Sequence, residues 1–136
     1  MVTDTNIVLD AITLTLSEIF PNSEVFGESV DQKLTDESFI VRVVSNITTP
    51  LLWTNTEENI LFEIVYFPKK GDVECYSVGN EVTRVLRLIE LSNSQKLYGK
   101  NIGYKVVDGI LHVSVSFRYF TREYEEAEMM EKLKIE

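Results

Sequence analysis

The fold is decided by the segment from Tyr104 to Glu123, which reads YKVVDGILHVSVSFRYFTRE. Two β-prone runs flank the dipeptide Asp108-Gly109, and such a dipeptide supplies the positive φ angles that a two-residue type I′ hairpin turn needs. A turn of this kind also fixes the register of the two strands. We therefore predict a β-hairpin in which Lys105 lies opposite His112.

The two faces of this hairpin differ in polarity. One face is apolar and is predicted to lie against the core; it carries Tyr104, Val106, Leu111, Val113, Val115, Phe117 and Tyr119. The other face is more polar; it carries Lys105, Val107, Ile110, His112, Ser114, Ser116 and Arg118. We predict that this hairpin completes a sheet.

The only histidine, His112, invites a catalytic interpretation because Ser114 and Ser116 share its face. A nucleophilic serine, however, usually sits at a strained turn beside oxyanion donors, as in a G-x-S-x-G motif, and the sequence contains no such motif. We interpret His112 as a surface or interface residue on a strand. A small hydrolase that uses His112 is the remote alternative.

The rest of the sequence predicts two helices and three further strands. Apolar residues at helical spacing indicate a helix over residues 7–20 and another from Asp72 to Ile89. On the buried stripe of the second helix, Gly79 is expected to let the helix approach the sheet closely. Strands are predicted from β-branched and aromatic runs, and a loop from turn-forming residues; the strands cover 24–30, 38–47 and 60–67, and the loop covers 48–59.

The predicted fold class is α+β, with two helices packed on one face of a mainly antiparallel sheet in the order α-β-β-β-α-β-β. We expect residues 1–124 to form a single α+β domain. Residues 125–136 are rich in glutamate and are expected to form an acidic C-terminal tail or a short helix.

Composition argues against several classes of function. The 136 residues carry a formal net charge of -9, which disfavours direct nucleic-acid binding, and the longest basic run is Lys69-Lys70. A single cysteine and a single histidine allow neither an internal disulfide nor the usual zinc sites. The sequence also lacks a glycine-rich phosphate loop, a signal peptide and an apolar run that could span a membrane. We expect a soluble protein made in the cytoplasm, with no cofactor.

Contact with other proteins is the interaction that the sequence favours. Pro50 is followed by Leu51, Leu52 and Trp53, an apolar group in a predicted loop, and loop aromatics are common at protein interfaces. The alternative is a loop folded back onto its own core. Three further candidate interface residues are Lys69, Lys70 and His112.

Five segments and their order carry a family resemblance. They are LSEIFPNSEVF (16–26), SFIVRVV (38–44), ILFEIVYFPKKGD (60–72), NEVTRVLRLIEL (80–91) and NIGYKVVDGILHVSVSFRYFTRE (101–123). With the acidic tail, they resemble the small tail terminator (tail completion) proteins of long-tailed bacteriophages and prophages. The resemblance covers most of the chain, and none of the segments is a catalytic signature.

This resemblance implies a non-enzymatic virion protein that forms a homo-oligomeric ring, commonly a hexamer, at the head-proximal end of the tail tube. Such a ring stops tube polymerisation and provides the surface on which the head joins. The implied partners are the tail tube protein and a head-completion (neck) protein, with assembly in the host cytoplasm. No family catalytic residue is carried over. The alternative is another phage morphogenesis subunit, such as a head-tail connector or a tube-like protein.

Overall fold

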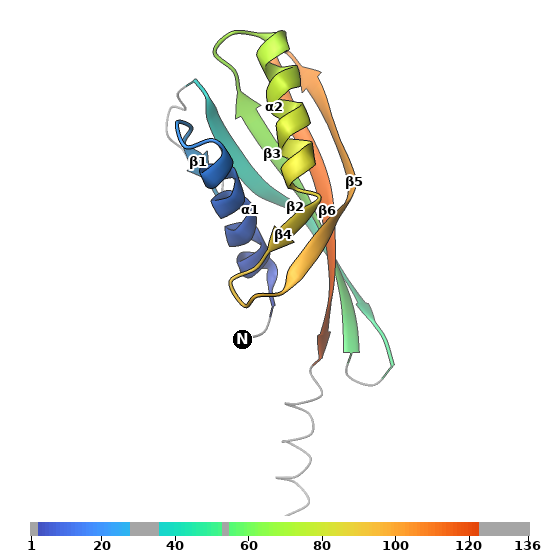
Figure 1. Ribbon diagram of the computed structural model, residues 1–136. Helices are drawn as coiled ribbons and strands as arrows, with labels where there is room; N and C mark the ends of the chain where they lie inside the picture. The colour runs from blue at the N-terminus through green and yellow to red at the C-terminus, as the bar shows by residue number, and fades with distance from the viewer. Residues whose placement is uncertain (1–2, 28–35, 53–54, 123–136) are drawn as a thin grey trace, which may run out of the picture.

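In the computed structural model, which describes residues 3–27, 36–52 and 55–122, two helices lie against a curled sheet of six strands (Figure 1). The strand order is β1-β2-β3-β6-β5-β4, and the predicted α+β class is confirmed. In chain order the elements are α1 (Thr5–Ile19), β1 (Val25–Phe26), β2 (Ser38–Pro50), β3 (Asn55–Phe67), α2 (Asp72–Val85), β4 (Leu88–Glu90), β5 (Lys96–Val107) and β6 (Ile110–Arg122).

Both helices cover the same face of the sheet. α1 packs against β1, β2 and β4, and α2 packs against β5 and β6. Neighbouring strands are antiparallel except for β1, which pairs in parallel with β2 at Phe39 and Ile40. The sheet is therefore mixed, and the predicted antiparallel character holds for the remaining pairs.

The hairpin of β5 and β6 has the predicted register. Asp108 and Gly109 have φ angles of 52° and 75°, and Lys105 pairs with His112. Side chains alternate between the two faces along a strand, so this turn orients the whole of β6. The inward residues of β6 are all buried; they are Leu111, Val113, Val115, Phe117 and Tyr119.

β3 lies between β2 and β6 and carries the middle of the core. Its inward residues Ile60, Phe62 and Ile64 are fully buried. The rings of Phe62 and Phe117 meet edge to face, with their centroids 6.1 Å apart, a preferred arrangement of two aromatic rings. The two central strands thus supply most of the large side chains over which the helices pack.

Helix α1 is fixed at both ends. The Asp4 carboxylate accepts a hydrogen bond of 2.9 Å from the backbone N–H of Ile7 and caps the first turn. At the other end, Pro21 follows the C-cap residue Phe20, and the Phe20 ring packs on Phe39 of β2 with the centroids 5.0 Å apart. These contacts hold α1 over the β1 and β2 end of the sheet.

Residues 48–59, predicted to be a loop, are mostly strand. β2 continues to Pro50 and β3 begins at Asn55, and cross-strand polar pairs replace apolar burial here. The Thr48 hydroxyl, for example, donates a hydrogen bond of 2.7 Å to Glu58. Pro50 is compatible with strand structure because no described strand pairs with the outer edge of β2 at that point. The loop prediction was wrong because polar residues can pair in a hairpin without facing a core.

The second helix is shorter than predicted, and the strand β4 follows it. α2 ends at Val85, whereas the prediction extended it to Ile89. The spacing of Val82, Leu86 and Ile89 fits a helix, but Ile89 and Leu91 are buried in alternation with exposed neighbours, as in a strand. Because residues 88–90 pair antiparallel with β5, this segment follows the strand period of two residues and not the helical period. The predicted order of elements therefore omitted β4.

Two further boundaries differ from the predictions. β1 spans Val25–Phe26, against a predicted strand over 24–30, of which residues 28–30 lie outside the described residues. β5 begins at Lys96, well before the predicted hairpin strand at Tyr104. The tail or helix predicted over 125–136 also lies outside the described residues, and the single domain over 1–124 stays a prediction.

Gly79 lets α2 approach β5 closely, as predicted. It is buried, and a Cβ atom on it would lie 2.9 Å from ring atoms of Tyr104, closer than carbon atoms pack. Tyr104 is on the core side of the hairpin but stays 36% exposed, and its hydroxyl donates a hydrogen bond of 3.0 Å to Asn80. Tyr104 of β5 therefore contacts two consecutive residues of α2, Gly79 and Asn80.

We expect Gly79→Ala to lower the free energy of unfolding by about 1 kcal/mol, because overpacking against Tyr104 outweighs the gain in helix propensity. In a Tyr104→Ala background the same substitution should instead raise it by about 0.5 kcal/mol, because only the propensity gain remains. Urea unfolding of the four proteins measures both effects. Stabilisation by Gly79→Ala in the wild-type background would contradict the role given to the close contact.

Candidate interaction surfaces

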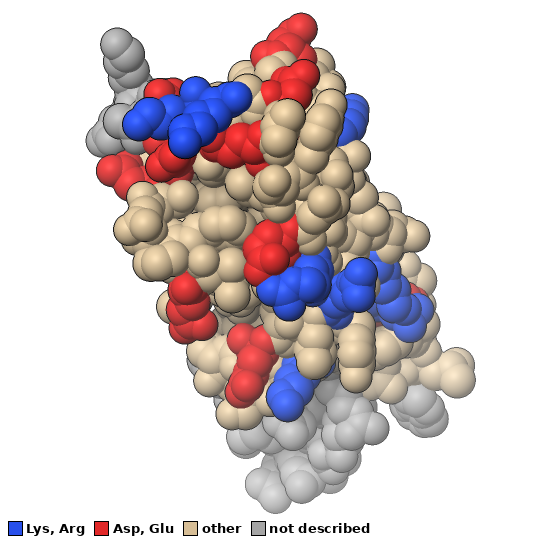
Figure 2. Space-filling view, turned by 45° about the horizontal axis from the view of Figure 1, so that its top comes forward, with Lys and Arg blue, Asp and Glu red and all other residues tan. Residues whose placement is uncertain are grey.

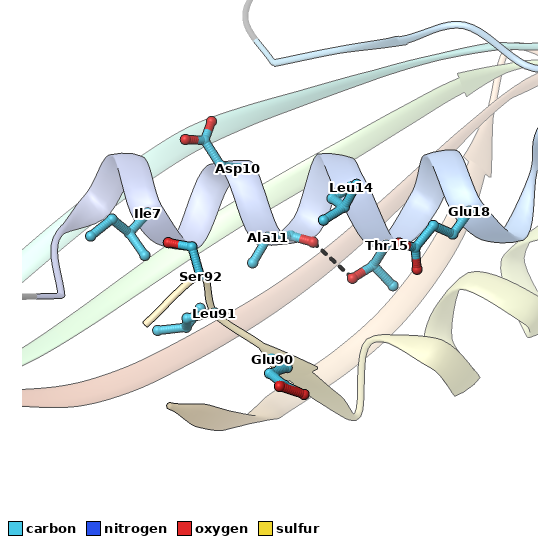
Figure 3. A pocket seen from close by; sticks show the side chains of 9 residues that line it. All are labelled: Ile7, Asp10, Ala11, Leu14, Thr15, Glu18, Glu90, Leu91 and Ser92. Carbon is cyan, nitrogen blue, oxygen red and sulfur yellow. Dashed lines mark hydrogen bonds between the residues drawn. The ribbon is translucent and has the colours of Figure 1, made fainter. Parts of the chain in front are cut away.

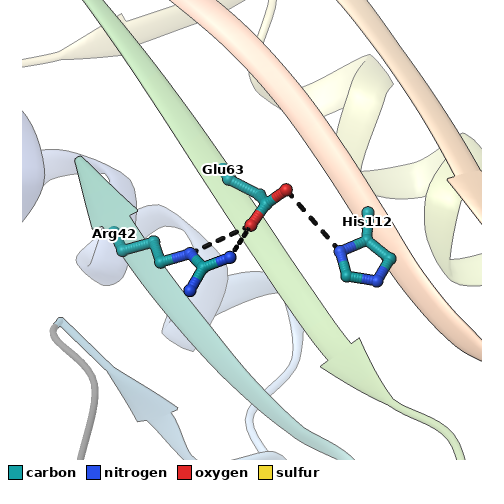
Figure 4. A network of polar contacts seen from close by, with 3 residues as sticks. All are labelled: Arg42, Glu63 and His112. Carbon is teal, nitrogen blue, oxygen red and sulfur yellow. Dashed lines mark hydrogen bonds and ion pairs between the residues drawn. The ribbon is translucent and has the colours of Figure 1, made fainter. Parts of the chain in front are cut away.

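A polar network lies on the sheet face opposite to the helices (Figure 4). Glu63 of β3 pairs in register with Arg42 of β2, and Arg42 Nε donates a hydrogen bond of 2.9 Å to Glu63 Oε1. His112 of β6 places its Nδ1 atom 3.6 Å from Glu63 Oε2. The network connects three neighbouring strands across a face that no described helix covers. Water screens the partly exposed ion pair between Arg42 and Glu63, so its contribution to stability is small.

This network lacks the geometry of a hydrolytic site. His112 contacts a carboxylate that Arg42 already binds, and among the described residues no hydrogen bond joins His112 to Ser114 or Ser116. A nucleophilic serine is normally within hydrogen-bond reach of its base. In the same part of the chain, no group of three or more His, Cys, Asp or Glu side chains could hold a metal ion. Nothing in this geometry favours the hydrolase alternative.

A groove runs between α1 and the chain that leaves β4 (Figure 3). Three of its lining residues are carboxylates, Asp10 and Glu18 of α1 and Glu90 of β4, and none is basic. The hydroxyl of Thr15, which also lines the groove, donates a hydrogen bond of 2.7 Å to the carbonyl oxygen of Ala11 in its own helix. The groove offers no base and nucleophile in contact, and its main chemical property is negative charge.

The turn between β3 and α2 is held by Glu74. Its carboxylate accepts hydrogen bonds from the backbone N–H groups of Lys69 at 3.1 Å and Lys70 at 2.9 Å, and from the Tyr66 hydroxyl at 2.6 Å. Glu74 lies in the first turn of α2, where the helix dipole also favours a negative charge. These bonds fix the backbone at Lys69 and Lys70 and leave both residues exposed.

The same contacts shift two pKa values in opposite directions. Burial raises the pKa of the Glu74 carboxyl, but the hydrogen bonds from Tyr66, Lys69 and Lys70 outweigh burial, and the net pKa is lowered from 4.5. Burial and the neighbouring Glu74 carboxylate raise the pKa of Tyr66 well above 10.0. The contribution of Glu74 to stability is therefore complete above the ordinary carboxyl pKa and is lost as the pH falls through the lower folded-state pKa.

We expect Glu74→Gln to lower the free energy of unfolding at neutral pH by about 1 kcal/mol, because the charge-assisted hydrogen bonds are weakened. The difference from wild type should shrink as the pH is lowered below the ordinary carboxyl pKa, where wild-type Glu74 also takes up a proton. Urea unfolding at neutral and acidic pH measures this. Glu90→Gln, at an exposed carboxylate with no ion pair among the described residues, is the matched control; a pH-independent loss in Glu74→Gln would contradict the assignment.

At the other end of β3 the sheet continues past both helices as a three-stranded arm (Figure 1), made of residues 47–52, 55–59 and 118–122. Polar side chains join its strands. The hydroxyls of Thr56 and Thr121 are hydrogen-bonded across β3 and β6. Arg118 Nη1 lies 3.4 Å from Glu57 Oε1, and the same guanidinium lies 5.6 Å from the centroid of the Phe120 ring. The strand pairing of the arm therefore depends mainly on polar contacts, and Tyr119, where the arm leaves the domain, is its buried core residue among the described residues.

The arm also exposes large apolar side chains. Leu52 is 80% exposed, Ile47 60%, Phe120 58% and Leu51 41%. The register places Ile47 opposite Asn59 and Asn59 opposite Arg118, so Ile47 and Phe120 share one face of the arm. Grouped apolar side chains on a protein surface commonly mark a contact with a partner.

The structure separates the candidate interface residues into two groups. Leu51 and Leu52 precede β3, whereas Lys69 and Lys70 follow it, so the length of this 13-residue strand lies between them, roughly 40 Å. His112 lies near the lysine end, because it pairs with Val65, two residues before the last residue of β3. The predicted candidates thus occupy two distant surfaces.

Two apolar residues of the arm were missed from the sequence, and one predicted residue cannot be placed. Trp53 lies outside the described residues. Ile47 and Phe120 were not predicted as interface residues, although a signal existed for Phe120: it follows Arg118 on the polar face of the final strand, where an exposed aromatic is unexpected. Recognising Ile47 required the strand pairing of residues 48–59, which the sequence prediction lacked.

Comparison with protein families identifies the class of the chain. A family model described as phage tail terminator protein matches residues 8–129, and the chain therefore belongs to the phage tail terminator family. This confirms the resemblance inferred from its segments. The family is one of structural proteins, so the chain is a structural component of a bacteriophage tail that associates with other tail components.

Other comparisons add little to this. A search among curated proteins gave no match. One protein of known structure aligns with 90% of this chain and 97% of its own, at 10% sequence identity and a TM-score of 0.44, and a likeness so remote carries no argument. Neither helix in the described part of the chain is long and apolar enough to cross a membrane.

Proposed function

We propose that the protein caps the head-proximal end of the tail tube as a ring of identical subunits, stops tube polymerisation and provides the surface on which the head joins. Membership of the terminator family supports this role. The observation that carries the proposal is the presence of two different exposed surfaces at the two ends of the subunit, the apolar arm and the basic turn after β3. A terminator must contact a tube on one side and head components on the other.

We assign the arm to the tube. Its strands are paired through polar side chains, so Ile47, Leu52 and Phe120 remain available to a partner. Complete burial of such a side chain contributes roughly 1.5–3 kcal/mol, and a ring repeats the contact in every subunit. Binding at the terminal ring of the tube would occupy the surface on which the next tube subunit adds, which is sufficient to stop growth.

We assign the opposite end of the subunit to the head-completion protein. Lys69 and Lys70 form a small basic group on a chain of net charge -9, and Glu74 holds their backbone in one conformation. His112 lies toward the same end, on the open face of the sheet. Basic side chains on a fixed turn favour a partner surface with acidic residues. The protein acts in this scheme by binding alone, without catalysis.

Tail length in the absence of the protein tests the proposal. Particles assembled without it should carry overlong tails when viewed by electron microscopy, because nothing limits tube growth. A head-tail connector would give a different result: tails of normal length and separate heads. Normal tails in the absence of this protein would therefore exclude termination.

We expect Leu52→Asp to weaken binding to the ends of purified tubes by at least about tenfold, because a charge replaces an apolar contact. The variant should unfold at the same urea concentration as wild type, since Leu52 is 80% exposed. Val73→Asp, at an apolar residue of α2 that is 75% exposed, is the matched control and should bind tube ends normally. Normal capping by Leu52→Asp would remove the arm from the tube contact.

A further inference from the structure

Acidic and basic residues are segregated along the chain. From Arg84 to Val107 there are five basic residues and one acidic residue, whereas residues 3–27 and 36–41 hold six acidic residues and no basic one. We call the first set the basic flank; its members are Arg84, Arg87, Lys96, Lys100 and Lys105. The acidic flank consists of Glu24 and Asp36, on the chain around β1; Asp10 and Glu18 are left out because they line the groove beside β4.

The two flanks lie at opposite ends of the strand order. The basic flank belongs to the end of α2 and to β5 and its surroundings, and the acidic flank belongs to the chain around β1. In the lower half of Figure 2, Lys and Arg side chains gather mainly on the right of the molecule and Asp and Glu side chains mainly on the left. The subunit is therefore electrically polar across the sheet, in addition to its net charge of -9.

These charges are not neutralised within the described part of the chain. Its four ion pairs include one residue of either flank, Arg84, which pairs with Glu81 in its own helix. All members of both flanks are exposed. Uncompensated charges of opposite sign on two sides of one molecule attract each other between copies and fix the relative orientation of those copies.

The flanks coincide with two open sheet edges. β4 pairs with β5 only over Lys96–Tyr98, and β1 pairs with β2 only at Phe39 and Ile40. Among the described strands, therefore, none covers the outer edge of β5 from Lys100 onward or that of β2 from Val41 onward. The three antiparallel pairings between them make β2 antiparallel to β5. In copies related by rotation about an axis along the strands, β5 of one copy would face β2 of the next in the antiparallel sense.

We infer that copies of this chain associate head to tail, with the basic flank of one copy against the acidic flank of the next. The inference rests on the proposed ring and specifies the contact that builds it. A head-to-tail contact joins two different surfaces, so it repeats from copy to copy until the rotation closes a ring. It also covers the two open edges, which otherwise expose unpaired backbone groups. The arm and the basic turn remain free at the two ends of the subunit.

Reversing the charge of one flank at a time tests this contact. The base-reversed variant carries Lys100→Glu and Lys105→Glu, and the acid-reversed variant carries Glu24→Lys and Asp36→Lys. Each variant alone sets like charges against each other, and we expect its association in sedimentation velocity at low salt to be at least about tenfold weaker than that of wild type. An equimolar mixture should restore association, because every contact in a mixed ring again joins an acidic flank to a basic one.

The matched control is a variant with Lys69→Glu and Lys70→Glu. It changes the net charge by the same amount as the base-reversed variant, two units for each of two residues, from -9 to -13. Its substitutions lie on the turn after β3, outside both flanks, so it should associate like wild type. If wild type is monomeric in solution, the same set of proteins is compared by chemical cross-linking on tube ends, where contact between copies is read directly.

Three results would overturn the inference: unchanged association in either reversed variant, a mixture that does not recover, or loss of duplex DNA binding as the sole effect of reversing the basic flank. The last would assign that flank to nucleic acid. The readout for capping is separate. Copies that associate through their flanks but do not stop tube growth would overturn the proposed function alone, and normal rings from either reversed variant would overturn the contact alone.

Discussion

The register between β3 and β6 is the constraint on which the rest of this structure depends. It places Phe62 and Phe117 under the helices and sends Glu63 and His112 to the open face. A slip of one residue would exchange the two faces, bury charge and expose the aromatic core. The helices cannot correct such an error, because they pack on whichever face the strands present. A local turn at Asp108-Gly109 helps to prevent it by fixing the strand that follows.

A feature could be predicted from the sequence when it depends on residues close together along the chain, and could not when it depends on pairing between distant segments. The hairpin register and the role of Gly79 follow from neighbouring residues, and both were predicted. β4 could not be predicted, because Ile89 fits a helical and a strand period equally and its pairing with β5 decides. The strand pairing of residues 48–59 was missed for a similar reason: Thr48 and Glu58 stabilise strands only when they lie opposite each other.

The candidate site shows the same limit. Leu51, Leu52, Lys69 and Lys70 were named from local features alone, as loop residues of unusual character. That they lie at two ends of the subunit follows from the length and continuity of β3, which the sequence prediction had shortened to residues 60–67. The separation of charge could have been counted along the chain. Its meaning depends on the strand order, in which β2, β3 and β6 separate β5 from β1.

The arm has a consequence for how this protein can change over generations. Its strands are joined by hydroxyls and charged groups, and its exposed apolar side chains contribute almost nothing to the buried core. Substitutions at Ile47, Leu52 or Phe120 should therefore leave folding nearly untouched, since exposed positions usually alter stability by about 0.5 kcal/mol or less. A lineage could then refit its arm to a different partner while the fold stays intact. Adapting to a new partner would then change the residues that recognise it and leave the stability of the fold nearly unchanged.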